Sequence, residues 1–195
     1  DSAGIAAVAK EYGADVMRRP AELAQDSTPI WDVLRHILIP DNLSYDCAVL
    51  LEPTSPLRQL GDVDKALAML EKRPDSDGII SVAPFTYNPI WNGFVLDTDG
   101  RLKYLMKEGY ESYQRQQVPE CIHHCGALYI WRTKFISTHP GGYQAGKFLP
   151  YYTDPTHALS IDTLPEMEWA ERLVSAGLIK LPWLESWDAS KVVPL

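Results

Sequence analysis

Apolar positions along the chain follow two alternating periods, which predict helices and strands in turn. Spacings of three and four residues predict helices over 5–9, 29–38, 63–72 and 165–177. Short continuous apolar runs predict strands covered on both faces over 47–51, 78–83 and 126–131, with weaker candidates at 14–17 and 157–162. This alternation is typical of an α/β domain with a mainly parallel sheet and helices on both faces. We therefore expect one domain over residues 1–195.

The alternation is interrupted between residues 87 and 117. The segment FVLDTDGRLKYL predicts a hairpin that turns at Asp99 and Gly100. Six aromatic residues lie in or beside it: Tyr87, Trp91, Phe94, Tyr104, Tyr110 and Tyr113. A solvent-exposed loop rarely carries so many large aromatic side chains. We therefore expect a second copy of the chain to cover them in a homodimer. The alternative is that they fold back on their own domain.

Composition limits the partners that the chain would bind. The formal net charge is −8 over 195 residues, which argues against broad binding to nucleic acid or to an anionic membrane. No apolar run approaches the roughly 20 residues that a membrane helix needs. Three cysteines are an odd number and no disulfide framework, so a cytoplasmic location is expected.

A polar, proline-rich loop follows the predicted strand at 47–51. Pro53 and Pro56 stiffen the segment 52–58, so that Thr54 and Ser55 would present hydroxyls and amides with little entropy to lose. Ligands of open α/β sheets bind beyond the carboxyl ends of the strands, which is where this loop lies. The alternative, a proline-rich turn that only ends the strand, is equally compatible with these residues.

Two further polar residues are candidates for chemistry. Asp162 follows a short apolar segment and precedes a predicted helix, so its carboxylate could hold Mg²⁺ with substrate phosphates. Its alternative role is a helix N-cap. Arg115 stands among uncharged polar residues and could bind a carboxylate or phosphate, although a solvated surface arginine would look the same.

The segment CIHHC carries metal-ligand residue types. On a strand, Cys121, His123 and Cys125 would share one face. A structural zinc site needs four such ligands, and no second cluster completes this one. A buried cysteine pair beside hydrogen-bonded histidines is therefore favoured over a metal site.

Five segments taken together resemble the acylneuraminate cytidylyltransferases, the CMP-sialic acid synthetases and their relatives for similar nonulosonic acids. They are RRPAELAQD, LLEPTSPLR, RQQVP, GALYI and SIDT, in this order between residues 18 and 163. The resemblance covers residues 1–174. It implies a Rossmann-like α/β domain of the nucleotide-diphospho-sugar transferase type, dimeric through an inserted segment, here 87–117. It further implies transfer of CMP from CTP to the anomeric hydroxyl of a sialic-type sugar, release of pyrophosphate, and Mg²⁺ as cofactor.

The resemblance also implies roles for particular residues. Arg19 matches a position at the cytidine end of the nucleotide, and Arg115 matches a catalytic basic residue near the sugar carboxylate and the phosphates. Asp162 matches a catalytic, metal-binding aspartate. The remaining matches surround the acceptor sugar: Glu52, Thr54, Ser55, Arg58, Tyr129 and Phe148.

The chain departs from the family at several of these places. The family begins with a strand and a basic, glycine-containing loop, which this chain is expected to lack at its start. It usually has Gln at Glu52 and a second aspartate at Ser160, and commonly Arg and Asn at His123 and Cys125. Two hypotheses follow: a cytidylyltransferase, or a homologue that has lost catalysis and acts as a binding or interaction module. In either case Glu52 and Asp162 should lie at strand ends that face one cleft.

Overall fold

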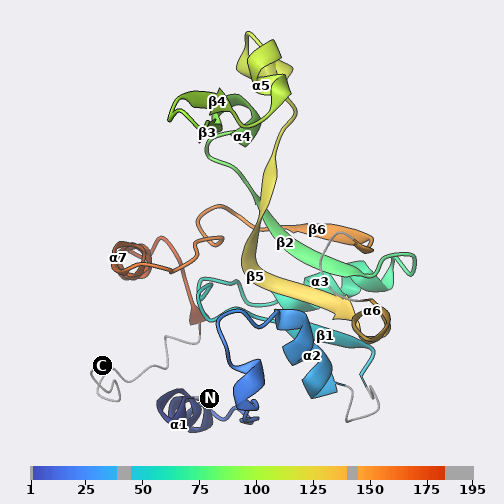
Figure 1. Ribbon diagram of the computed structural model, residues 1–195. Helices are drawn as coiled ribbons and strands as arrows, with labels where there is room; N and C mark the ends of the chain where they lie inside the picture. The colour runs from blue at the N-terminus through green and yellow to red at the C-terminus, as the bar shows by residue number, and fades with distance from the viewer. Residues whose placement is uncertain (1, 39–44, 140–144, 183–195) are drawn as a thin grey trace. The chain divides into compact units, whose positions relative to one another are not determined.

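Figure 1 shows the computed structural model, which describes residues 2–38, 45–139 and 145–182. The chain forms two compact units. The first combines Asp1–Ala48 with Trp131–Lys147, and the second combines Val49–Ile130 with Phe148–Leu195. The boundary between them falls inside two strands, β1 (Cys47–Leu50) and β5 (Ile122–Arg132).

The first unit is built from helices. They are α1 (Ala3–Glu11), the 3₁₀ helix η1 (Ala21–Leu23), α2 (Ile30–Leu38) and α6 (Thr133–Thr138). Trp31 on α2 packs against Trp131 and Phe135, with ring centroids 5.0 and 5.8 Å away. The predicted strand at 14–17 is wrong. These residues form a mostly exposed segment without regular secondary structure, because a short apolar run becomes a strand only where a neighbouring strand pairs with it.

The main sheet has four strands in the described part of the chain, in the order β1-β5-β2-β6. β2 (Gly78–Pro84) pairs in parallel with β6 (Phe148–Tyr152), as Figure 1 shows. The helices α3 (Asp62–Glu71) and α7 (Leu164–Ser175) belong to the same unit. The predicted Rossmann-like α/β class is thus confirmed.

The predicted strand at 157–162 is wrong. Residues 157–162 form a turn and a loop. The fourth strand of the sheet is β6 instead, and its Pro150 is tolerated because β6 is the last strand in the sheet order. Asp62 is the first helical residue of α3, and Gly61 is the N-cap. The buried Asp62 carboxylate instead accepts hydrogen bonds from the Tyr151 hydroxyl (2.8 Å) and the Gln59 amide (2.9 Å).

The predicted hairpin is confirmed. β3 (Phe94–Leu96) pairs antiparallel with β4 (Leu102–Tyr104), and Gly100 adopts a left-handed φ of 76° in the turn between them. The helix α4 (Pro89–Asn92) precedes the hairpin in the chain, and α5 (Lys107–Glu111) and the 3₁₀ helix η2 (Arg115–Gln117) follow it.

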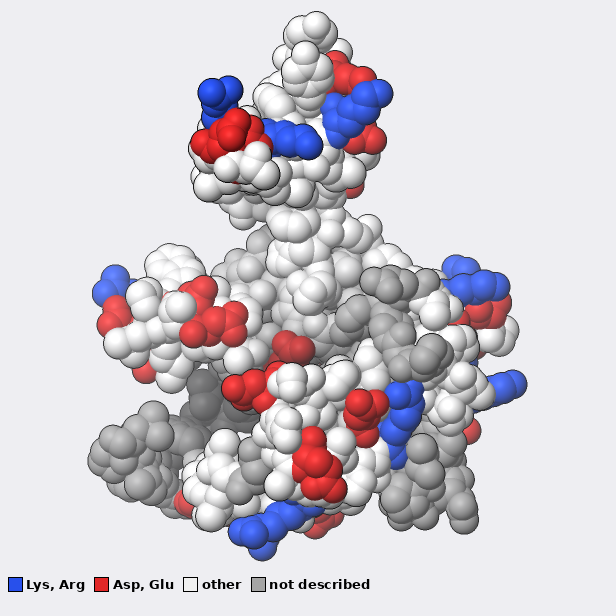
Figure 2. Space-filling view, viewed as in Figure 1, with Lys and Arg blue, Asp and Glu red and all other residues white. Residues whose placement is uncertain are grey.

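Basic and acidic side chains are interspersed among the described residues on the face drawn in Figure 2. Within the described ranges, no helix has the length and apolar character needed to cross a membrane.

Candidate functional site

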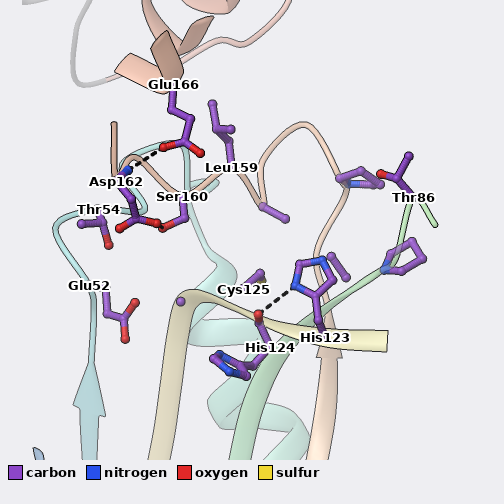
Figure 3. Close-up of a pocket in the computed structure, with 15 residues that line it drawn as sticks. Glu52, Thr54, Thr86, His123, His124, Cys125, Leu159, Ser160, Asp162 and Glu166 are labelled. Carbon is purple, nitrogen blue, oxygen red and sulfur yellow. Dashed lines mark hydrogen bonds between the residues drawn. The ribbon is translucent and has the colours of Figure 1, made fainter. Parts of the chain in front are cut away.

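A cavity of about 560 Å³ lies in the second unit and brings together four segments of the chain. Its lining comes from the loop after β1, the end of β2, the start of β5, and the loop that leads into α7 (Figure 3). Glu52 and Thr54 come from the first segment, and Ser160, Asp162 and Glu166 from the last. We call this the acidic cavity. As predicted, Glu52 and Asp162 face one cavity, but Asp162 lies in a loop and not at a strand end.

Gly126 allows the first and third segments to meet. It has a left-handed φ of 67° inside β5, which other residues rarely adopt. A Cβ at this position would overlap the Glu52 carboxylate and lie 2.9 Å from Ser55 Oγ. The Ser55 hydroxyl donates to the carbonyl of Cys125 at 3.1 Å. The loop after β1 can therefore pack directly against β5 at Gly126, where no side chain stands in the way.

Ser55 and Arg58 have structural roles in this loop. Ser55 is fully buried, so the prediction that its hydroxyl is presented to a ligand is wrong, because the buried Cys125 carbonyl needs that donor. Arg58 Nε donates to the carbonyl of Ala127, and its Nη2 donates to the carbonyl of Glu52 at 3.3 Å. Burial lowers the pKa of Arg58, and the charge of Asp62 partly offsets this effect. Neither side chain lines the acidic cavity.

The same loop is tied to the segment that carries Asp162. The amide of Ile161 donates to the carbonyl of Thr54 at 2.7 Å. The Nδ1 atom of His157 donates to the carbonyl of Leu57 at 3.0 Å. Leu57 itself packs in a buried cluster with Ala170 and Leu173 of α7. These contacts hold the two polar segments at a fixed spacing.

Asp162 is not the N-cap of α7, because Thr163 has that position in a capping box. Glu166 Oε2 accepts from the amides of Asp162 (2.9 Å) and Thr163 (2.8 Å), and from the Thr163 hydroxyl (2.8 Å). These hydrogen bonds, led by the one from Asp162, lower the pKa of Glu166. Asp162 Oδ2 accepts from the Ser160 hydroxyl at 3.2 Å. Glu166 is not among the predicted site residues, although a threonine followed three residues later by a glutamate signals a capping box.

Of the segment CIHHC, His123, His124 and Cys125 lie near the start of β5 and line the acidic cavity from below in Figure 3, whereas Cys121 precedes the strand. His123 Nδ1 donates to the carbonyl of His124 at 2.9 Å, and His124 Nδ1 lies 3.1 Å from the Tyr129 hydroxyl. Cys125 is buried but Cys121 is only half-buried, so the expected buried cysteine pair is not formed. Over residues 2–38, 45–139 and 145–182, no three His, Cys, Asp or Glu side chains gather to hold a metal ion.

The charge of the cavity is negative. Glu52, Asp162 and Glu166 line it, and no Lys or Arg of the described chain does. Mg²⁺ usually takes one or two protein carboxylates, with waters and substrate phosphates completing its shell. Glu52 and Asp162, on the same side of the cavity in Figure 3, supply the oxygen donors that this chemistry requires. Glu166 is less suited, because three donors already occupy one of its oxygens.

Arg115 lines a different cavity, of about 420 Å³, which we call the Arg115 cavity. Phe85, Asn88 and Glu120 also line it, and Pro84 belongs to both cavities. Arg115 is exposed at the start of η2. The structure therefore does not bring the predicted catalytic pair, Arg115 and Asp162, into one cavity.

The predicted aromatic residues do not line either of these cavities. Tyr129 is 2% exposed. Phe148 pairs with Gly78 at the start of β2, whereas Ala83 and Pro84 at its end line the acidic cavity. Five residues of strand separate these ends by about 16 Å. Arg19 lies half-buried in the first unit, just before η1.

Comparisons with known proteins support the resemblance found in the sequence. No family model matches the chain. It is 29% identical over 170 residues to an N-acylneuraminate cytidylyltransferase from Escherichia coli O18:K1:H7, a match that covers 87% of this chain and 39% of that protein. It is 26% identical over 171 residues to a CMP-N,N'-diacetyllegionaminic acid synthase from Legionella pneumophila, covering 85% and 68%. The chain thus spans about two fifths of the first relative's length.

The fold is shared with a solved enzyme. A CMP:2-keto-3-deoxy-manno-octonic acid synthetase, whose structure was determined in complex with CTP, matches with a TM-score of 0.59. The match covers 91% of this chain and 79% of the other at 15% sequence identity. At that identity the comparison establishes the fold alone.

Proposed function

We propose that this chain, a homologue of the N-acylneuraminate cytidylyltransferases, is a CMP-sugar cytidylyltransferase. It would transfer CMP from CTP to a hydroxyl of a sialic-acid-type nonulosonic sugar and release pyrophosphate. One observation carries the proposal: Glu52 and Asp162, from two motifs more than one hundred residues apart, line one cavity. Sequence similarity to the two named relatives extends over 87% and 85% of the chain.

Each part of the acidic cavity has a task in this reaction. Glu52 and Asp162 would hold the Mg²⁺ ion, which when bound supplies positive charge against the triphosphate. The hydrogen bonds of Ser55 and Arg58 keep the loop with Glu52 and Thr54 in place before substrate arrives. The cavity volume of about 560 Å³ lies within the range of small-molecule sites. Arg115, in the neighbouring cavity, would bind the carboxylate of the sugar.

A second function, binding without catalysis, is favoured by the charge of the same cavity. A triphosphate would meet three carboxylates there and no lysine or arginine of the described chain. Glu52 and Ser160 replace the Gln and Asp that the resemblance leads us to expect. Losing one such charge partner typically costs a few kcal/mol of transition-state stabilisation, so turnover should be slow.

Pyrophosphate release separates the two functions. The chain is assayed with CTP, Mg²⁺ and a panel of nonulosonic acids, with ATP as the nucleotide control. We expect slow, acceptor-dependent release that is specific for CTP, is abolished in Asp162→Asn, and is raised by Ser160→Asp, which adds a carboxylate beside Asp162. Binding of CTP in calorimetry, without release by either the natural chain or the Ser160→Asp variant, would favour the binding function.

We also propose that the chain forms a homodimer through residues 87–117. Large side chains of the hairpin are exposed there, among them Leu96 (69%), Leu102 (71%) and Tyr110 (76%). Leu96 and Leu102 are directly paired across β3 and β4. Light scattering at micromolar concentration should give the mass of two chains, and Leu96→Lys with Leu102→Lys should give the mass of one. A monomeric natural chain would contradict the proposal.

A further inference from the structure

The His123 ring is held in a single tautomer. Its Nδ1 atom lies 2.9 Å from the carbonyl oxygen of His124. A carbonyl oxygen only accepts, so Nδ1 must carry the hydrogen. A neutral imidazole has one N–H, which leaves the basic lone pair on Nε2. The ring also packs against Phe85, with centroids 4.8 Å apart and planes inclined at 51°, so that its orientation is fixed from two sides.

The lone pair of His123 is directed into the acidic cavity. Figure 3 shows the second ring nitrogen on the far side of the ring from the dashed bond, turned toward the space that Leu159 and Thr86 border. Nε2 has no hydrogen-bond partner among the described residues. His123 is thus a half-buried base whose orientation is set by the protein and whose reactive atom remains available.

The other titratable groups of the cavity are less suited to accept a proton from a substrate. These groups are Glu52, His124, Cys125, Asp162 and Glu166. Glu166 already accepts three hydrogen bonds, and His124 Nδ1 is engaged with the Tyr129 hydroxyl. Cys125 is 5% exposed, and Glu52 and Asp162 are the carboxylates assigned above to the metal.

The charge of the cavity favours the product of such a proton transfer. An imidazole that gains a proton becomes a cation, and the carboxylates of Glu52 and Asp162 line the same space. Opposite charges that are already in place stabilise a developing charge without reorganisation. The ordinary pKa of imidazole, close to neutral pH, makes histidine the commonest group for this task.

We propose that His123 is the general base of the reaction, an inference that rests on the proposed cytidylyltransferase function. The acceptor hydroxyl oxygen forms a bond to the α-phosphorus of CTP. The bond from that phosphorus to the bridging oxygen breaks, and its electron pair leaves with pyrophosphate. The hydroxyl proton moves to His123 Nε2 and passes to water after the products depart. His123 is then a catalytic residue at a position where the resemblance predicts an arginine.

Two substitutions separate basicity from positioning. In His123→Asn the side-chain amide nitrogen takes the place of Nδ1, so the bond to the His124 carbonyl is kept while Nε2 is lost. His36→Asn is the control, because it makes the same replacement on α2, outside the lining of both cavities. We expect kcat for pyrophosphate release to fall about 100-fold or more in His123→Asn, since general bases contribute that much. The control should stay near the natural chain.

Further readouts exclude a merely structural role. The kcat of the natural chain should fall as the pH is lowered and the base is protonated, and this acid limb should vanish in His123→Asn. Added imidazole should restore part of the lost rate, with little change in the KM for CTP. If His123→Asn does not fold, His123→Gln provides the same test, since its amide has no basic lone pair.

Three outcomes would overturn the assignment. Unchanged kcat in the folded variant would remove His123 from the reaction while leaving the cytidylyltransferase function in place. A lower kcat with the acid limb retained and no rescue by imidazole would make His123 a structural residue. Absence of pyrophosphate release by the natural chain with every acceptor would overturn the proposed function and the base together.

Discussion

The acidic cavity and the Arg115 cavity adjoin at Pro84 but differ in charge and in construction. The acidic cavity carries three carboxylates, and its walls are held by buried contacts of Ser55 and Gly126. The Arg115 cavity has its guanidinium on a short, exposed 3₁₀ helix. The loop that carries Glu52 is thus fastened to β5 by buried contacts, whereas the guanidinium of Arg115 lies on an exposed segment.

The two cavities would thus meet two different requirements of the proposed reaction, metal coordination and the binding of an anionic group. Metal coordination needs donors that are placed before the ligand arrives, and buried hydrogen bonds provide that placement. Binding an anionic group needs less accuracy, because charge attraction acts over several ångströms. A ligand with phosphates at one end and a carboxylate at the other would use both cavities. Three sets of variants test how far the two cavities differ.

Gly126→Ala should have the largest effect, because the new methyl group would both strain the backbone and collide with the loop that forms one wall of the acidic cavity. A left-handed φ costs a residue with a side chain about 1–2 kcal/mol, and overlap with Glu52 and Ser55 adds to this. We expect a loss of about 3 kcal/mol in the free energy of unfolding, measured in urea. Gly100→Ala is the control, with a φ of 76° and nothing within 4 Å, and should lose about 1 kcal/mol. Equal losses would show that the close approach at Gly126 is unimportant.

Charge removal should act in opposite directions in the two cavities. For CTP without metal, Asp162→Asn should tighten binding by relieving repulsion, and Arg115→Gln should weaken it. Each effect should be about 1 kcal/mol, or roughly fivefold in Kd, as expected for charges near a solvated surface. Calorimetric titration measures both, and Arg101→Gln in the hairpin turn is the control for net charge. Changes of the same sign would contradict the division between the cavities.

Glu166→Gln should have the smallest effect and should depend on pH. Hydrogen bonds from the Asp162 amide and from Thr163 lower the pKa of Glu166 in the folded chain. A carboxyl with a lowered folded pKa stabilises the protein above its unfolded pKa, and this stability is lost as pH falls through the folded value. The variant should therefore melt slightly below the natural chain at pH 7 and match it in acid. Glu168→Gln removes the same charge from the same helix outside the cavity lining, and its melting temperature is the reference at each pH.

Elements with strong local patterns could be predicted from the sequence. The helix at 30–38, the strand at 78–84 and the turn at Gly100 follow from periodicity and from glycine's access to positive φ. β6 could not be predicted, because its sequence FLPYY contains a proline and becomes a strand only by pairing with β2. The apolar runs at 14–17 and 157–162 have no such pairing and form no strand.

The sequence by itself determined the α/β class, the hairpin, and the convergence of Glu52 and Asp162 on one cavity. Only the tertiary structure decided which polar side chains reach that cavity. The carbonyls of Cys125 and Ala127 lie inside the fold and require donors, and Ser55 and Arg58 supply them. The bond from His123 to the His124 carbonyl leaves Nε2 directed into the cavity. Motif spacing reports which residues come near a site, but the buried backbone groups around it determine which side chains remain available.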